Sequence, residues 1–374
     1  MSTHNKIDRD SANAITNALS FFETPNTNVS VTSSSVIELL TLNPINITPY
    51  HFKIHASTNY VDLAKCYVLT ELRIRKEDEN GRLTNLEAAD NNVSCCQLIG
   101  HTIWKNCRIS INGTQIFEGN SLMAYKTDGT QRSAQFMAKL DVDICNQPRY
   151  LVNQCEVDIE LLPHDSNFLI VAPGATNHKY HLEVLACKLY IKKIELMDSL
   201  AFDIAKKLEL KPARYPMRKT SLKSLFISES RAEFNANLWM DQVPRRVVLG
   251  MVKNSDFVGS QKTQPFNFQH FNLRDISINA GGVNYPASPY SLDFPNGKYV
   301  RIYHDMQEAI GYAGTLDSNG ISMQRFSTGG FCLLVFNLTN SQEDNGPETF
   351  DLIKNGTTSV KMSFNEPIPQ GGLF

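Results

Sequence analysis

Short apolar runs and apolar–polar alternations dominate the first half of the chain from Tyr50 onward. They are rich in Val, Ile, Leu, Tyr and Phe, and they occupy residues 51–57, 64–76, 103–117, 156–163, 168–174 and 181–196. Alternation with a period of two, carried by β-branched and aromatic residues, favours strands. Asn112-Gly113, inside one run, is the dipeptide of a two-residue hairpin turn in which both residues take positive φ. The pattern therefore predicts a β-sandwich or jelly roll over residues 47–197.

The pattern changes after this stretch. Leu200, Ile204 and Leu208 recur every four residues. Asp198 precedes them as a candidate N-cap, and a proline stops the pattern. We expect a helical linker over residues 198–214.

The linker region is the most basic part of the chain. Its Lys and Arg residues are Lys206, Lys207, Lys211, Arg214, Arg218, Lys219 and Lys223. Such a stretch can contact phosphates. Lys residues near the C-terminal end of a helix are also common without any ligand, because they interact favourably with the helix dipole and are solvated. The whole chain has 36 Lys+Arg against 38 Asp+Glu and a formal net charge of -2. Its overall charge is therefore not expected to attract nucleic acid or anionic lipid. Nucleic-acid contact beyond this weak patch is not expected.

Strand patterns return in the second half of the chain. They occupy residues 221–229, 245–252, 271–286, 331–338 and 359–367. Gly281-Gly282 marks a hairpin turn, and one helical insertion is expected near residues 298–314. The second half is therefore predicted to be another β domain, residues 215–374, in tandem with the first.

Residues 1–46 differ from both β domains. Residues 24–48 are rich in Ser, Thr and Asn, with one short apolar run from Val36 to Leu42. Because this composition buries little apolar surface on its own, we expect a partly disordered N-terminal arm that orders only when it packs against something.

Several sequence features bear on the compartment. The N-terminal twenty or so residues have no apolar core of a secretory signal, and no stretch of about 18 uncharged apolar residues occurs. We therefore expect an intracellular protein that is not secreted and has no membrane partner. The eight cysteines are then expected to be reduced thiols, most of them small core residues.

Recognisable catalytic motifs are missing from the sequence. It has no phosphate-binding glycine loop, no nucleophile elbow, no H-E-x-x-H and no C-x-x-C pair. His51 and His55 would share one face of a strand, but roughly 13 Å apart, too far to share one metal ion without a bend. Catalytic, cofactor-binding and metal-binding residues are therefore not predicted.

Other candidate groups have simpler interpretations. His178 and His181 differ by three positions, which places them on opposite faces of a strand. The adjacent Cys95 and Cys96 cannot chelate as a pair. The acids Glu77, Asp78 and Glu79 are interpreted as a solvated turn.

One long set of segments resembles a known family. The set begins with VPRRVVLGMV at residues 243–252 and continues in order through residues 256–268, 271–286, 291–303, 319–339 and 350–364. Together these segments resemble the second half of the double jelly-roll major capsid protein of Maverick/Polinton elements and adintovirus-like viruses. The first half resembles that family more loosely, at residues 60–74, 107–117, 124–127 and 189–196.

The resemblance implies an all-β structural protein without an active site or cofactor. Two tandem eight-stranded jelly rolls would stand side by side, and a homotrimer would form a pseudo-hexagonal capsomer that contacts neighbouring capsid subunits in a virion. The family usually adds a further strand beyond Gly371-Gly372-Leu373-Phe374, so the second roll is expected to lack its last strand and to expose an edge. An endogenised, truncated copy in a host genome would explain this.

Two other function classes remain open at this point. A non-catalytic jelly-roll binding protein would recognise a carbohydrate or a protein partner through exposed aromatic residues such as Tyr285, Tyr290 and Tyr312. An enzyme of the cupin type would need a cluster of His and carboxylate ligands inside one roll.

Overall fold

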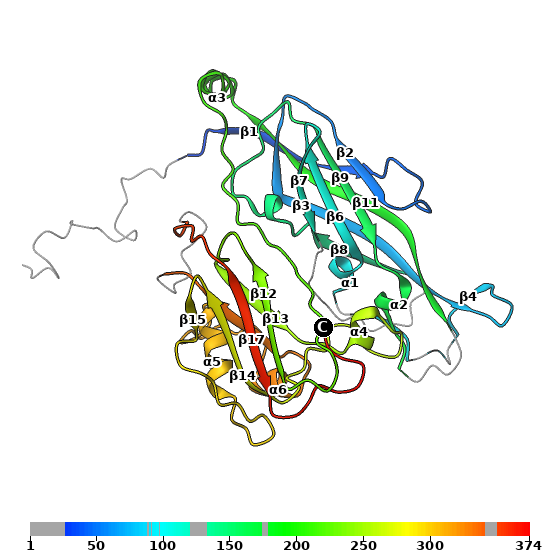
Figure 1. Ribbon diagram of the computed structural model, residues 1–374. Coiled ribbons are helices and arrows are strands. Elements are labelled where there is room, and N and C mark those ends of the chain that lie inside the picture. Colours follow the sequence, from blue (N-terminus) through cyan, green and yellow to red (C-terminus); the bar gives the residue numbers. More distant parts are fainter. Residues whose placement is uncertain are drawn as a thin grey trace, which may run out of the picture.

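Two β-sandwiches follow one another along the chain and lie side by side (Figure 1). The computed structural model describes residues 27–87, 90, 92–96, 98–119, 133–173, 179–340 and 350–374. Residues 1–26, most of the predicted arm, lie outside this described part.

The first sandwich has two antiparallel sheets. One contains β1 (Val31–Leu40), β3 (Tyr60–Glu77), β4 (Leu83–Asn85), β8 (Ala134–Lys139) and β11 (Tyr180–Leu196), in the order β1-β11-β3-β4 with β8 also on β3. The other contains β2 (Tyr50–Ile54), β6 (Trp104–Ile111), β7 (Thr114–Gly119) and β9 (Val157–Pro163), in the order β2-β9-β6-β7. Short elements complete it: β5 (Ser94–Cys95), β10 (Ile170–Val171), α1 (Ile99–Thr102), α2 (Ser166–Leu169) and a 3₁₀ helix (Asp143–Asn146).

Alternating side chains of both sheets build the first core. Phe52 of β2 and Ile159 of β9 are each 1% exposed, and Leu189 of β11 is fully buried. This follows from the period of two along each strand, which sends every second side chain inward. Val31–Leu40, which the sequence pattern assigned to the arm, is a strand of this sandwich, with Ile37 and Leu39 packed against its core.

The second sandwich repeats the strand order of the first. Its larger sheet contains β12 (Glu233–Trp239), β14 (Leu273–Ala280), β15 (Val283–Tyr285) and β17 (Thr358–Phe364), in the order β12-β17-β14-β15. Its smaller sheet pairs β13 (Arg246–Gly250) with β16 (Leu333–Asn337). Three helices complete it: α4 (Asn254–Val258), α5 (Val300–Ala309) and α6 (Met323–Ser327). Of the eight strands expected for this roll, six are named strands in the described residues, because its terminal segments form isolated bridges instead.

Helix and turn predictions can be checked directly. Asn112 and Gly113 have φ of 48° and 77°, and Gly281 and Gly282 have φ of 58° and 87°, as two-residue hairpin turns require. Helix α5 confirms the predicted insertion and buries Ile302 in the second core.

The linker helix α3 (Asp198–Leu210) is also confirmed, and none of its residues is buried. The prediction of Asp198 as its N-cap is wrong. Met197 occupies the N-cap position, and Asp198 is the first helical residue. Its carboxylate still lies in the first turn, where the helix dipole favours a negative charge.

Candidate functional site

The contact between the two sandwiches combines aromatic ring contacts with side-chain hydrogen bonds to the backbone. Phe168 of α2 stacks on His164 at a ring distance of 4.2 Å and meets Phe266 of the second sandwich edge-on at 5.6 Å. Gly259 approaches the same ring system so closely that a Cβ there would lie 3.3 Å from the Phe168 backbone. Gly259 also has a φ of 96°, so both sterics and backbone conformation favour glycine.

Gln261 adds a polar clamp to this contact. Its Nε2 donates to the Tyr180 carbonyl at 2.7 Å, and its Oε1 accepts from the Tyr180 N–H at 3.1 Å. The Gln261 carbonyl also accepts from the Ala172 N–H at 2.6 Å. The side-chain amide thus acts as a strand partner for the first residue of β11, which satisfies backbone groups that would otherwise be buried without partners.

The segment after α3 fastens itself to the first sandwich. Tyr215 accepts a hydrogen bond from the Val152 N–H at 2.9 Å and donates one to the Tyr150 carbonyl at 3.1 Å. Burial raises the pKa of the Tyr215 hydroxyl, which keeps it protonated as a donor. Further along, Thr220 binds the carboxylate of Asp143 through its N–H and its hydroxyl. The segment after α3 is therefore anchored to the first sandwich by hydrogen bonds from Tyr215 and Thr220.

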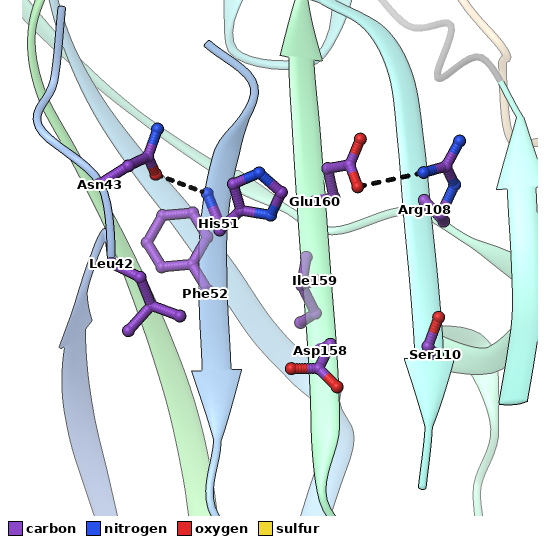
Figure 2. A pocket seen from close by; sticks show the side chains of 9 residues that line it. All are labelled: Leu42, Asn43, His51, Phe52, Arg108, Ser110, Asp158, Ile159 and Glu160. Atoms are coloured by element: carbon purple, nitrogen blue, oxygen red, sulfur yellow. Dashed lines mark hydrogen bonds and ion pairs between the residues drawn. The ribbon is translucent and has the colours of Figure 1, made fainter. Parts of the chain in front are cut away.

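A shallow hollow of ≈ 260 Å³ lies on the outer face of the first sandwich (Figure 2). Leu42 and Asn43 form one wall, and strands β2, β9 and β6 form the floor. Its polar groups are largely paired with one another: Arg108 donates to Glu160 at 3.2 Å, and the Asn43 Oδ1 accepts from the His51 N–H at 3.0 Å. This arrangement offers a ligand few unsatisfied groups.

Cys66, Cys95 and Cys187 are poor nucleophiles in this structure. Burial raises the pKa of Cys95 and of Cys187 to about 12. The pKa of Cys66 is also raised, first by a hydrogen bond with Cys145 and then by burial. Because the thiolate is the reactive form, these thiols are suited to packing.

The residues considered from the sequence do not assemble into a catalytic group. His51 and His55 are both exposed, and neither belongs to a metal-ligand cluster in the described part of the chain. His181 forms a 2.8 Å contact with Glu77, and Asp78 accepts from backbone N–H groups of its own turn. His178 lies outside the described residues.

Cys95 lies in β5, and Cys96 is buried with its Sγ 3.2 Å from the Thr102 hydroxyl. The basic residues from Lys206 onward lie along α3 and the largely exposed segment after it.

One cluster of ligand-type side chains was not anticipated from the sequence. His304, Asp305 and Glu308 of α5 bring their ligand atoms within 4.8 Å of one another. Asp305 already accepts a 2.6 Å hydrogen bond from Tyr290 and faces Arg301 at 3.9 Å, and His304 is exposed. The group is thus a surface ion-pair network on an exposed helix face.

The expectation of an exposed aromatic Tyr290 is wrong. Its side chain is 4% exposed because it packs in the second core and donates to Asp305. Tyr285 is half-buried, and Tyr312 is 37% exposed. The three tyrosines therefore do not form one ligand-binding surface. The inter-sandwich residues Phe168, Gln261 and Phe266, by contrast, were not anticipated, since their partners lie far away in the sequence.

Comparisons with known proteins show which sequences and structures this chain is similar to. No protein-family model matches the chain. An uncharacterized protein of Caenorhabditis elegans is 28% identical over 372 residues, covering 87% of this chain and 88% of that protein.

Solved structures show the fold. The capsid structure of the Sputnik virophage matches 96% of this chain and 88% of its own, with a TM-score of 0.58 and 11% identity. The PBCV-1 virus capsid matches 92% and 86%, with a TM-score of 0.56 and 10% identity, and the mavirus major capsid protein matches 99% and 92%, with 0.50 and 8%. The chain therefore has the double jelly-roll fold of viral major capsid proteins, a fold that is typically non-catalytic. Within the described residues, no helix has the length and apolarity needed to cross a membrane.

Proposed function

We propose that this chain is a structural protein, the major capsid protein of a Maverick/Polinton-type element or virus, or its host-encoded remnant. The observation that carries the proposal is the pair of rolls, locked together through Phe168, Gln261 and the linker. A rigid double roll is a building block that works by shape and by subunit contacts. Capsid proteins with this fold assemble with other subunits.

In this proposal three copies form a pseudo-hexagonal capsomer, since each copy supplies two similar rolls. The chain is divided into an arm (1–46), a first roll (47–197), a helical linker (198–214) and a second roll (215–374). Part of the arm, Val31–Leu40, lies on the first roll as β1. The protein would then be found in a virion when assembled, and inside the cell otherwise.

Large exposed apolar side chains support a role in subunit contacts. Val36 and Leu40 of β1 are 66% and 63% exposed, and Met137 on β8 is 58% exposed. Both strands lie at an edge of their sheet in the first roll. Apolar groups at such places are typical of surfaces that a neighbour covers.

The proposal is tested by the mass of the purified full-length chain. Size exclusion with light scattering is expected to give about three times the 42.0 kDa subunit mass. Negative-stain images of that peak should show particles with three-fold symmetry. The double variant Val36→Asp/Leu40→Asp should weaken the trimer more than Val300→Asp, a control on α5 with 55% exposure. A folded monomer at every concentration would contradict the proposal.

A further inference from the structure

Helix α5 carries three metal-ligand side chains on the side that faces away from the second core (Figure 1). Its opposite side packs in that core through the buried Ile302 and Met306. His304 and Glu308 are exposed and four residues apart, so they lie about one turn apart on the same face of the helix. With the neighbouring Asp305, they bring their ligand atoms within 4.8 Å of one another.

The carboxylate of Asp305 is held in place from the core side. Tyr290, whose side chain is 4% exposed, donates a hydrogen bond to the Asp305 Oδ2 at 2.6 Å. The other oxygen, Oδ1, lies 3.9 Å from the Nδ1 of His304, which is too long for a hydrogen bond. Tyr290 thus orients Asp305 towards His304 in the way that outer hydrogen-bond partners orient the ligands of a metal.

The separations of these ligand atoms fit one metal ion after small rotations. Tetrahedral coordination with metal–ligand bonds of about 2.0 to 2.2 Å places neighbouring ligand atoms about 3.4 Å apart. His304 Nδ1 and Asp305 Oδ1 therefore need to approach by about 0.5 Å, and no pair in the group by more than about 1.4 Å. His304 and Glu308 are exposed, so rotation of their side chains supplies these shifts without moving the helix backbone.

The local charge favours a cation. Asp305 and Glu308 supply two carboxylates, and the nearest basic group is Arg301, whose Nε faces the Asp305 Oδ2 at 3.9 Å. The two Nη atoms of Arg301 donate to the carbonyls of Pro289 and Ser288 at 3.1 and 3.0 Å, which holds the guanidinium on the Oδ2 side of the carboxylate. Glu308 also lies in the last turn of α5, where the helix dipole favours positive charge.

The ligand types narrow the choice of metal. Mg²⁺ and Ca²⁺ are bound by oxygen ligands, whereas an imidazole nitrogen favours Zn²⁺ and neighbouring transition metals. One imidazole with two carboxylates is a ligand set that zinc accepts. Three protein ligands also leave the fourth position of a tetrahedral zinc ion open to water or to a ligand from another molecule.

We propose that His304, Asp305 and Glu308 form a binding site for a divalent transition-metal ion such as Zn²⁺, with Tyr290 as the residue that positions Asp305. The bound ion would link the last two turns of α5 on their exposed side. All of these residues belong to one copy of the chain, so the site is independent of whether three copies form a capsomer.

The test is a calorimetric titration of the full-length chain, freed of metal by a chelator, with ZnCl₂ alone. Saturable binding is expected. His304→Gln and Glu308→Gln should each weaken it at least about tenfold, because the loss of even an outer partner of a metal ligand costs about 10- to 100-fold in affinity. His55→Gln, which removes another exposed histidine, should leave this binding unchanged. Circular dichroism checks that each variant is folded.

Two further measurements separate a zinc site from a simple acidic cluster. Tyr290→Phe keeps the ring in the core and removes the hydroxyl, so it should weaken zinc binding about tenfold. Equal concentrations of Mg²⁺ should not displace zinc, because Mg²⁺ gains little from the imidazole. No saturable binding to the folded wild-type chain, unchanged binding in His304→Gln, or displacement by equal Mg²⁺ would overturn the proposal. Unchanged binding in Tyr290→Phe would overturn the positioning role of Tyr290.

Discussion

Phe52 and Phe326 are buried in the first and second core, with side chains 1% and 0% exposed. Replacing either by Ala removes buried apolar surface and leaves a cavity, so the free energy of unfolding should fall by about 3 to 5 kcal/mol. Phe202→Ala on α3, where the side chain is 61% exposed, should stay within about 0.5 kcal/mol of wild type. Urea unfolding followed by circular dichroism measures all three. Equal losses at the buried and exposed positions would contradict the assigned cores.

His164 should make stability depend on pH at the contact between the rolls. Burial and the nearby Lys105 lower the pKa of His164 from 6.5 to about 4, and Asp165 opposes them with a smaller effect that raises it. Between these pH values the unfolded chain binds a proton that the folded chain does not, so the free energy of unfolding falls as pH drops from 6.5 towards 4.

The variant His164→Phe keeps the stack on Phe168 and removes the titrating ring, so its loss of stability between pH 7 and pH 5 should be smaller than that of wild type. Thermal unfolding at the two pH values measures this. His304→Gln, an exposed control on α5, should retain the wild-type difference. An unchanged pH dependence in His164→Phe would contradict the assignment.

Residue burial could be predicted from the sequence only where a pattern repeats. Six of the eight cysteines are buried, as expected for small core residues. Tyr290 escaped prediction because it packs in the second core and donates to Asp305, a residue of a different element. A single aromatic residue in a loop carries no periodic signal of the surface that covers it.

At the scale of elements, the Asn112-Gly113 turn of the β6–β7 hairpin requires positive φ at both residues. A Cβ on Gly113 would meet no atom within 4 Å, so the cost of Gly113→Ala comes from its φ of 77°. We expect a loss of about 1 to 2 kcal/mol in the free energy of unfolding. Gly113→Asn should lose less, because Asn tolerates this conformation. Chemical denaturation compares them, and equal losses would show that space, not backbone conformation, decides.

Helix α3 should contribute little to the stability of the rolls. None of its residues is buried, whereas α5 buries Ile302, Met306 and Ala309. Ala205→Pro should break α3 and leave the urea midpoint of the β structure nearly unchanged. Ala309→Pro in α5 should cost about 3 kcal/mol. A large loss from Ala205→Pro would mean that α3 supports the fold in a way its exposure does not indicate.

Local elements were accessible from the sequence, and long-range pairings were not. Hairpin turns and helices α3 and α5 have signals within a few residues of themselves. By contrast, β1 was assigned to the arm because its Ser-rich stretch buries little. It is a strand because Val36 and its neighbours pair with Lys192 and other residues of β11, far along the chain.

On the scale of the whole molecule, the sequence predicted two tandem rolls because both halves carry the same β periodicity. Their common strand order, β2-β9-β6-β7 and β12-β17-β14-β15, could not be read from periodicity, which does not say which strands are neighbours. The contact between the two rolls also could not be predicted from the sequence. Gln261 is one polar residue in a loop, and its role depends on the backbone of Tyr180.

The contact between the two rolls at Gln261 and Tyr180 should couple their stabilities. Each roll holds one of the two tryptophans, Trp104 in β6 and Trp239 in β12, so Trp239→Phe and Trp104→Phe backgrounds report the first and second roll separately. In either background, Gln261→Ala leaves the N–H and carbonyl of Tyr180 without their partner, which should cost about 1 to 3 kcal/mol.

The coupling predicts that Gln261→Ala lowers the urea midpoints reported by both tryptophans and moves the two unfolding curves apart. Gln324→Ala, at an exposed position of α6, should leave both curves in place. If Gln261→Ala shifted one curve and left the other untouched, the rolls would be thermodynamically independent.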